Sequence, residues 1–375
     1  MFSWLIWWKK LDWFLIINIL FLNLFSLAAL YSLTSQENMN WSNLFIRQAF
    51  FILLGFALHL LISRIDYRIS KNYNKIFFLF VFILLALVLI AEPIRGVSSW
   101  FAVFGQTFQP AEFAKLAIVF FLAKYLSEKS KVFYLWRHVL WTGLVVAVIA
   151  AMVAQQPDFG SAFIIFCLWL VAILMTKINW RQVLTIFGVI IVGGFIIWNS
   201  FLQPYQQARI MSFINPEQDA QSHGYNVQQA IIAVGSGQVL GKGLGLGTQS
   251  QLNFLPEQYS DFIFAVIAES FGWWGVLLLL SLYLVFFWRL LNAVREGGDP
   301  YGTWMLLCFF IYLSVQTIIN IGMNIGILPV TGITLPFVSY GGSSLVTSYI
   351  ALGLIQSYLI SKKEKLFVYG QSKEF

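Results

Sequence analysis

Long apolar runs separated by short polar segments dominate the chain. Ten such runs can be drawn, and most approach the roughly 20 residues that a helix needs to cross a bilayer. The pattern therefore predicts an all-α, polytopic membrane protein with about ten transmembrane helices, forming a single domain over residues 1–375. The predicted spans are 11–33, 45–63, 76–92, 110–126, 139–154, 161–176, 182–202, 261–291, 301–321 and 340–360.

The lysines and arginines indicate the direction in which these spans run. With the N-terminus inside the cell, 18 of the 23 basic residues fall in cytoplasmic segments, as the positive-inside rule requires. Both termini are therefore expected to be cytoplasmic. No small-residue cleavage site follows the first apolar run, which we expect to remain as a signal anchor. The five basic residues outside the cytoplasmic segments are Arg47, Arg95, Lys115, Arg209 and Lys242.

Two connections on the external side differ from the short loops elsewhere. Residues 203–260 form one long external loop that contains an amphipathic stretch from Tyr225 to Val234 and a series of glycines. Loops of this length are usually functional or disordered, and the ordered pattern favours function. Residues 322–339 are rich in Gly and Pro yet apolar. We expect them to form a re-entrant or interfacial loop packed on the bundle, because irregular backbone cannot face lipid.

Composition excludes several classes of function. The chain is 59% hydrophobic and 10% charged, with a mean hydropathy of +0.77, whereas soluble domains carry about 25% charged residues. The net charge of +7 does not indicate nucleic-acid binding, since the basic residues flank the membrane. The two cysteines, Cys167 and Cys308, lie in apolar runs without metal-ligand or disulfide spacing, so redox and zinc chemistry are not expected.

Ionisable residues at the membrane are the candidates for chemistry, because burying a charge there costs at least about 2.5–3.5 kcal/mol. Asp261 opens the eighth predicted span, directly after the long external loop. It is either a helix cap that complements the helix dipole or a general base at the external surface. Glu269 lies eight residues further, about 12 Å deeper. This is too far for a carboxylate pair, and we expect it to hold the bundle together.

Two further groups lie at the starts of predicted spans. Glu112 and Lys115 are three residues apart and share a helix face, so they either neutralise one another as an ion pair or bind a substrate; a lysine near the outer leaflet would suit a pyrophosphate headgroup. Asp158 follows Pro157, which is typical of a helix start.

The long external loop contains two basic residues, Arg209 and Lys242. They are either ordinary loop charges or contacts for an anionic lipid-linked substrate. Lys242 lies in the glycine series Gly235 to Gly247, which does not form a nucleotide-binding loop, because Gly243 rather than Ser or Thr follows the lysine. Close packing of the backbone explains these glycines adequately.

Several motifs in order along residues 10–360 resemble the SEDS family (shape, elongation, division, sporulation). Within that family, Gly247–Glu257 and Leu328–Gly332 resemble the RodA branch of elongation rather than the FtsW branch of division. The motifs that carry the resemblance are Gln109-Pro-Ala-Glu-Phe-Ala-Lys115, Gln155-Gln-Pro-Asp-Phe-Gly-Ser161, Gly241-Lys-Gly, Tyr259-Ser-Asp-Phe-Ile-Phe-Ala-Val-Ile-Ala-Glu269 and Pro329-Val-Thr-Gly-Ile-Thr-Leu-Pro-Phe-Val-Ser-Tyr-Gly-Gly-Ser-Ser344.

The resemblance implies a membrane glycosyltransferase that polymerises lipid II, the undecaprenyl-pyrophosphate-linked disaccharide peptide, in the bacterial cell membrane with its active site external. It also implies complexes with a class B penicillin-binding protein and other elongation proteins. Asp261 matches the family's essential aspartate, and Glu112 and Lys115 match a salt bridge near its cavity. Ser99 departs from the family, in which many members carry Arg before Trp100, and this departure is expected to alter how a phosphate is held. Ala111 and Ser270 are milder departures.

These observations predict an inverting transfer in which Asp261 deprotonates the acceptor sugar. Lys115, Arg209, Lys242 or a divalent cation such as Mg²⁺ or Mn²⁺ would offset the charge on the leaving pyrophosphate; Glu112, Trp100 and Asp158 complete the candidate substrate-binding set. Two alternatives remain open. One is a lipid flippase or transporter, against which the external position of the charges argues, and the other is a non-enzymatic scaffold.

Overall fold

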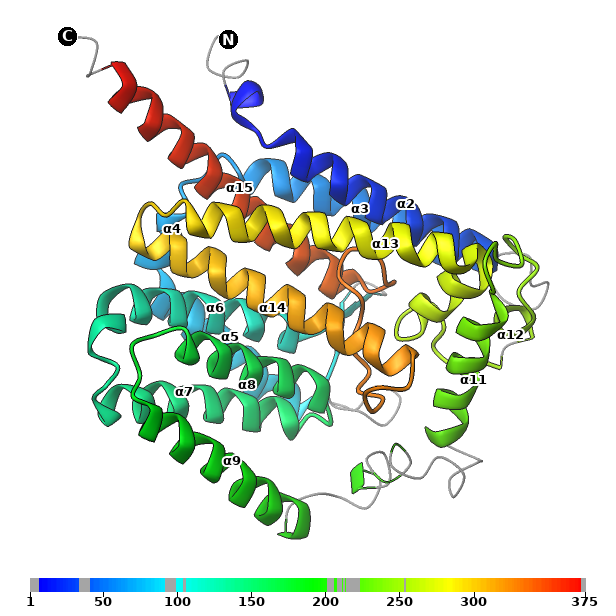
Figure 1. Ribbon diagram of the computed structural model, residues 1–375, viewed down its shortest axis with the longest axis horizontal. Helices are drawn as coiled ribbons and strands as arrows, with labels where there is room; N and C mark the ends of the chain where they lie inside the picture. Colours follow the sequence, from blue (N-terminus) through cyan, green and yellow to red (C-terminus); the bar gives the residue numbers. More distant parts are fainter. Residues whose placement is uncertain are drawn as a thin grey trace.

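A computed structural model describes residues 7–33, 41–91, 99–103, 106–200, 206–207, 211, 213, 223–252 and 254–371. The described chain is a helical bundle, and each of the ten predicted spans overlaps one long helix (Figure 1). These ten helices are α2 (Trp13–Leu33), α3 (Trp41–Ile62), α5 (Asn74–Ile90), α6 (Pro110–Lys129), α7 (Trp136–Ala154), α8 (Phe159–Leu174), α9 (Trp180–Ser200), α13 (Ile263–Arg295), α14 (Pro300–Asn324) and α15 (Gly342–Gln371).

Shorter elements connect these helices. They are α4 (Arg68–Asn72), the 3-10 turn η1 (Ser130–Val132), α11 (His223–Ser236), α12 (Thr248–Gln251) and the strands β1 (Phe101–Val103) and β2 (Gln106–Phe108). Helix α11 covers the predicted amphipathic stretch. The two strands pair antiparallel, with Phe101 opposite Phe108. This small hairpin was not expected from the sequence, since its strands are only three residues long.

Membrane spanning follows from length and apolar composition. Among the described residues, seven helices are long and apolar enough to cross a bilayer: α2, α3, α7, α9, α13, α14 and α15. Helices α5 and α8 are apolar but shorter, and α6 carries charged residues at both ends. The chain is therefore an all-α, multi-pass membrane protein.

Both described ends of the chain lie at one end of the bundle. Lys10 forms an ion pair with Glu364 at 2.7 Å, and Lys363 donates to the backbone oxygen of Lys10 at 3.0 Å, so the start of α2 meets the distal part of α15 (Figure 1). An even number of spans connects two termini on the same side. Helices α11 and α12 lie at the opposite end, beside the start of α13 (Figure 1).

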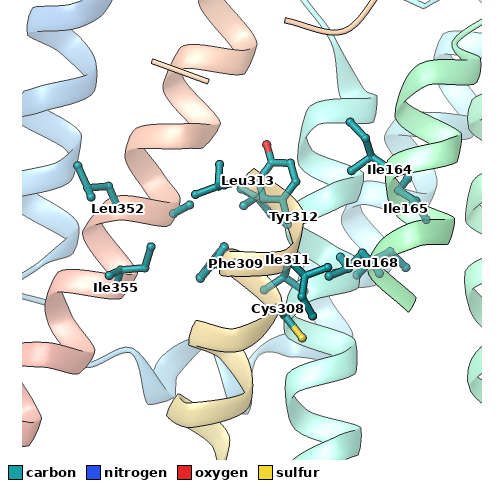
Figure 2. Close-up of a cluster of buried hydrophobic side chains, with 14 of the residues drawn as sticks. Ile164, Ile165, Leu168, Cys308, Phe309, Ile311, Tyr312, Leu313, Leu352 and Ile355 are labelled. Carbon is teal, nitrogen blue, oxygen red and sulfur yellow. The ribbon is translucent and has the colours of Figure 1, made fainter. Parts of the chain in front are cut away.

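The core is centred on α14, which is enclosed by its neighbours. Ile164 and Leu168 of α8 lie on one side of it, and Leu352 and Ile355 of α15 lie on the other (Figure 2). Cys308 of α14 is buried in this apolar cluster, and both cysteines are free. By contrast, α9 runs along the edge of the bundle (Figure 1) and most of its large apolar side chains are exposed.

Candidate functional site

Asp261 lies in a turn at the end of the bundle opposite the two described chain ends. The sequence analysis placed it at the opening of the eighth span, but α13 begins at Ile263 and its N-cap is Phe262, without a side-chain cap. Asp261 is therefore not the N-cap residue of α13. The side chains of Asn320 and Asn324 each donate to its backbone oxygen at 3.0 Å. The backbone of Asp261 is thus fixed by contacts that do not use its carboxylate.

The segment that follows α14 forms the wall beside this carboxylate. A Cβ added to Gly332 would lie 3.6 Å from Oδ2 of Asp261, and Gly332 has a positive φ of 72°, which glycine adopts without strain. Asn320 also donates to the backbone oxygen of Ile333 at 2.7 Å, and the N–H of Tyr340 donates to Tyr259 at 2.9 Å. This loop, residues 325–341, packs into the bundle, as the re-entrant prediction requires.

Asp158 caps the N-terminus of α8 at the same end of the bundle. Its Oδ1 accepts from the N–H of Ser161 at 2.9 Å, and its Oδ2 accepts from Nε2 of Gln109 at 2.6 Å. The helix-start interpretation is therefore confirmed. Burial raises the pKa of Asp158, whereas the hydrogen bond from Ser161 and the charge of Lys115 lower it. The adjacent Gly160 lies against the 325–341 loop, where a Cβ would overlap its backbone.

Glu112 and Lys115 form the predicted ion pair, with 2.8 Å between Nζ and Oε1. Their side chains are 5% and 1% exposed, respectively. Lys115 also donates to Oε1 of Gln316 at 3.3 Å, and Glu112 accepts from the hydroxyl of Thr347 at 3.2 Å. Gln316 in turn donates to the backbone oxygen of Thr334 in the loop at 3.0 Å. The ion pair therefore supports the 325–341 loop through Gln316. A pyrophosphate would contact Lys115 only after the ion pair separates.

Lys242 and Glu269 form a second ion pair, at 3.1 Å, in which Glu269 is fully buried and Lys242 is partly exposed. Glu269 also accepts from the backbone N–H groups of Gln249 and Ser250, at 2.9 and 3.0 Å. These N–H groups belong to the first turn of α12, a favourable place for a negative charge. Glu269 thus anchors the long loop to α13. Lys242, Gln249 and Ser250 are the partners through which Glu269 has the structural role expected from the sequence.

The glycine series packs against a break in α13. Gly272 has φ 64° and ψ −160° inside the helix. At this break, the N–H groups of Lys242 and Gly243 donate to the carbonyls of Glu269 and Ser270, at 2.9 and 3.0 Å. A Cβ on Gly241 would overlap the backbone of α13. Close packing against the backbone of α13 therefore explains Gly237 and Gly241, as the sequence indicated, whereas Gly243 and Gly245 have a positive φ.

Glu269→Gln is expected to loosen this part of the external loop. The amide keeps the volume but removes the charge-assisted bond to Lys242. Its NH2 group also takes the place of a carboxylate oxygen that accepts from a backbone N–H of α12. Such a loss costs about 1–3 kcal/mol. Hydrogen exchange over residues 237–252 should become faster. Ser281→Ala, at an exposed position of α13, serves as the control, and unchanged exchange in Glu269→Gln would contradict this anchoring role.

The remaining candidates for substrate binding are Trp100 and Arg209. Trp100 is partly buried and directly precedes β1, and Ser99 donates to the backbone oxygen of Gln156. The hairpin is joined to the site because the N–H of Gln109 donates to Ser343 at 3.0 Å. Arg209 lies outside the described residues.

The sequence analysis missed the buried amides of α14. Gln316, Asn320 and Asn324 follow one another at intervals of four, so they share one helix face, and all three are fully buried. They contact the pair of α6, the 325–341 loop and Asp261, respectively. The sequence does contain a signal for these residues. Burying three amides on one face of an apolar span costs free energy unless they are hydrogen-bonded, so such a pattern indicates specific partners.

The described residues contain no group of three or more His, Cys, Asp or Glu side chains that could hold a metal ion. The protein alone therefore offers no complete cage in this part of the chain. Mg²⁺ is commonly bound by one or two carboxylates together with substrate phosphates and water. Asp261 could supply one such carboxylate, so a divalent ion fits only as a companion of a bound phosphate.

Known proteins resemble this chain over most of its length. The peptidoglycan glycosyltransferase MrdB of Escherichia coli is 33% identical and is matched over 95% of this chain and 96% of its own length. The probable peptidoglycan glycosyltransferase FtsW of Thiomicrospira cyclica is 36% identical over 83% of this chain and 81% of its own. A chain from a structure of a peptidoglycan synthase complex superposes with a TM-score of 0.79, at 28% identity, covering 93% of this chain and 97% of that one. Residues 9–365 match the model of the FtsW/RodA/SpoVE cell cycle proteins, and the chain belongs to this family.

Proposed function

We propose that this protein is a peptidoglycan glycosyltransferase that polymerises lipid II at the external face of the membrane. The observation that carries the proposal is the position of Asp261, a carboxylate at the external end of the bundle whose backbone is fixed by two buried amides. Relatives matched over nearly the whole chain are named peptidoglycan glycosyltransferases, which supports the reaction class. In the proposed topology, all ten long helices cross the membrane, including the charged helix α6, and both termini are cytoplasmic.

In the proposed reaction, Asp261 accepts the proton of the 4-hydroxyl of the acceptor's GlcNAc. The hydroxyl oxygen forms a bond to the anomeric carbon of MurNAc in the donor. The bond between that carbon and the pyrophosphate oxygen breaks, and undecaprenyl pyrophosphate leaves with the electron pair. The attack occurs opposite the leaving group, so the configuration inverts. The sugars require an aqueous space on the external side, and the prenyl tail requires the apolar surface of the bundle.

The leaving pyrophosphate needs positive charge nearby. Lys242 is the more accessible described candidate, with 28% of its side chain exposed against 1% for Lys115. We therefore propose Lys242, together with Arg209, as the first contacts, and Lys115 only if the pair with Glu112 opens. A divalent ion bound with the pyrophosphate would supply further charge. No step assigned to Asp261 depends on it.

We further propose that the protein acts with a class B penicillin-binding protein in cell elongation, beside other elongation proteins. The likeness to a chain of a complex that coordinates polymerization and crosslinking supports the first part. The match to MrdB over nearly both full lengths supports the second. Depletion of this protein in rod-shaped cells should give round cells. Filamentous cells would instead indicate a role in division.

The function is tested with purified protein and labelled lipid II, with and without the penicillin-binding partner. Glycan ladders that require this protein would support the polymerase. Transport of lipid II across vesicle membranes, without ladders from an intact complex, would instead support the flippase. The two readouts therefore separate these functions in one preparation.

A further inference from the structure

A groove with a volume of about 460 Å³ opens between α5, α6 and α7. It lies at the end of the bundle that the proposed topology places in the cytoplasm, where Lys124 at its edge donates to the backbone oxygen of Lys71 in α4 at 3.2 Å. The connection that carries α4 also contacts α14's start, where Tyr67 donates to Asp299 at 3.1 Å. We call this feature the α5–α7 groove.

One wall of the groove is a single face of α5. Its lining residues on this helix are Asn74, Lys75, Phe78, Leu79 and Phe82, which recur at the three- and four-residue spacing of one helix face. Leu79 is 58% exposed and Phe82 is 37% exposed. These apolar side chains are thus only partly covered by protein, and in a membrane their exposed surface is open to lipid tails.

The opposite wall comes from α6 and α7. Phe121, Lys124 and Glu128 line it from α6, and Trp141 and Val145 line it from α7. Trp141 is 53% exposed, and tryptophan favours the boundary between headgroups and tails. The volume lies within the range of about 300–1,000 Å³ that is typical of small-molecule sites. The groove is therefore large enough for part of a lipid.

Charge is concentrated at one end of the groove. Lys75 lies in the first turn of α5 and Lys124 lies near the end of α6, so both flank the same end of the groove. Phe78 and Phe82 continue along α5 towards the membrane interior. The carboxylate of Glu128 lies 3.9 Å from Nζ of Lys71, which offsets its charge. In the described part of the chain, Lys75 has no carboxylate partner. A positive end and an apolar body match the two parts of an anionic phospholipid.

We propose that the α5–α7 groove binds an anionic phospholipid of the cytoplasmic leaflet, with its phosphate between Lys75 and Lys124 and an acyl chain along Phe78 and Phe82. Basic pockets between transmembrane helices on this side suit such headgroups. The site is separate from the proposed active site, since Glu112 and Glu128 are 16 residues apart on α6, about 24 Å. A lipid here would join α5, α6 and α7 at the end remote from Asp261.

The test uses a phosphatidylglycerol with a photoactivatable group in its acyl chain, added to the full-length protein in phosphatidylcholine bilayers. Label should map to residues 74–82, 121–128 and 141–145. Unlabelled phosphatidylglycerol should compete at least about tenfold better than phosphatidylcholine, because each lysine near the surface favours anionic lipid by about a factor of five. Equal competition by the two lipids, or label spread evenly around the bundle, would overturn the proposal.

Two variants and a matched control sharpen the test. Lys75→Gln with Lys124→Gln should remove the preference for phosphatidylglycerol, whereas Lys129→Gln with Lys131→Gln, which removes the same charge outside the groove, should retain it. Val145→Trp should reduce labelling of the groove with all charges in place. Equal loss in the control pair would show general attraction to the membrane surface and overturn a specific site. Unchanged thermal melting of each variant excludes misfolding as the cause.

Discussion

Replacing Asp261 with Asn is expected to lower the rate of lipid II polymerisation by about 10²–10⁴-fold, the range that general bases contribute. Asparagine has the shape of aspartate but cannot accept the hydroxyl proton. The fold should be unaffected, because Asn320 and Asn324 hold the backbone oxygen of residue 261 rather than its side chain. The measurement is the initial rate of glycan formation by the complex with its penicillin-binding partner.

Glu257→Gln is the matched control for this variant. Glu257 lies four residues before Asp261 and is exposed, and its backbone oxygen accepts from the N–H of Asp261 at 3.1 Å. The control removes one external negative charge, so a general electrostatic effect would appear in both variants. We expect Glu257→Gln to polymerise at close to the wild-type rate. If Asp261→Asn also polymerised at close to the wild-type rate, Asp261 would not be the general base.

Lys115→Met is expected to destabilise the protein by about 3–5 kcal/mol, the cost of removing one partner from a buried pair. Methionine fills a similar volume but leaves the carboxylate of Glu112 buried without its cation. It also removes the bond to Gln316, which orders the 325–341 loop. The measurement is unfolding in detergent, followed by the loss of monodisperse protein with temperature.

The double variant Glu112→Gln with Lys115→Met separates charge from packing. We expect it to recover a substantial part of the stability lost in the single variant, since no unpaired charge then remains buried. A double variant that is as unstable as the sum of the two single variants would show that the residues contribute independently. A fully stable Lys115→Met would show that Glu112 is not held by this pair.

Spans and local pairs could be predicted because they depend on residues close together in the chain. Apolar runs located the ten long helices of the described residues, and the three-residue spacing of Glu112 and Lys115 located their ion pair, since both are properties of a single helix. Asp158 followed from the same local rules for a helix start.

Long-range partners could not be obtained this way. Glu269 is neutralised by Lys242, 27 residues earlier, through a fold of the external loop that no periodicity reveals. The break of α13 at Gly272 is similar, because it depends on backbone partners supplied by the loop. Asp261 was identified as a candidate from its position, but its fixation by Asn320 and Asn324 depends on how α13 and α14 pack.

The central claim is that Asp261 acts in the transfer step rather than in holding the precursor. The most direct test measures bound labelled lipid II and glycan formed in the same sample of Asp261→Asn, in complex with its penicillin-binding partner. The account predicts lipid II binding at the wild-type level with almost no glycan. Glycan formed at the wild-type rate, or loss of binding together with loss of glycan, would contradict it.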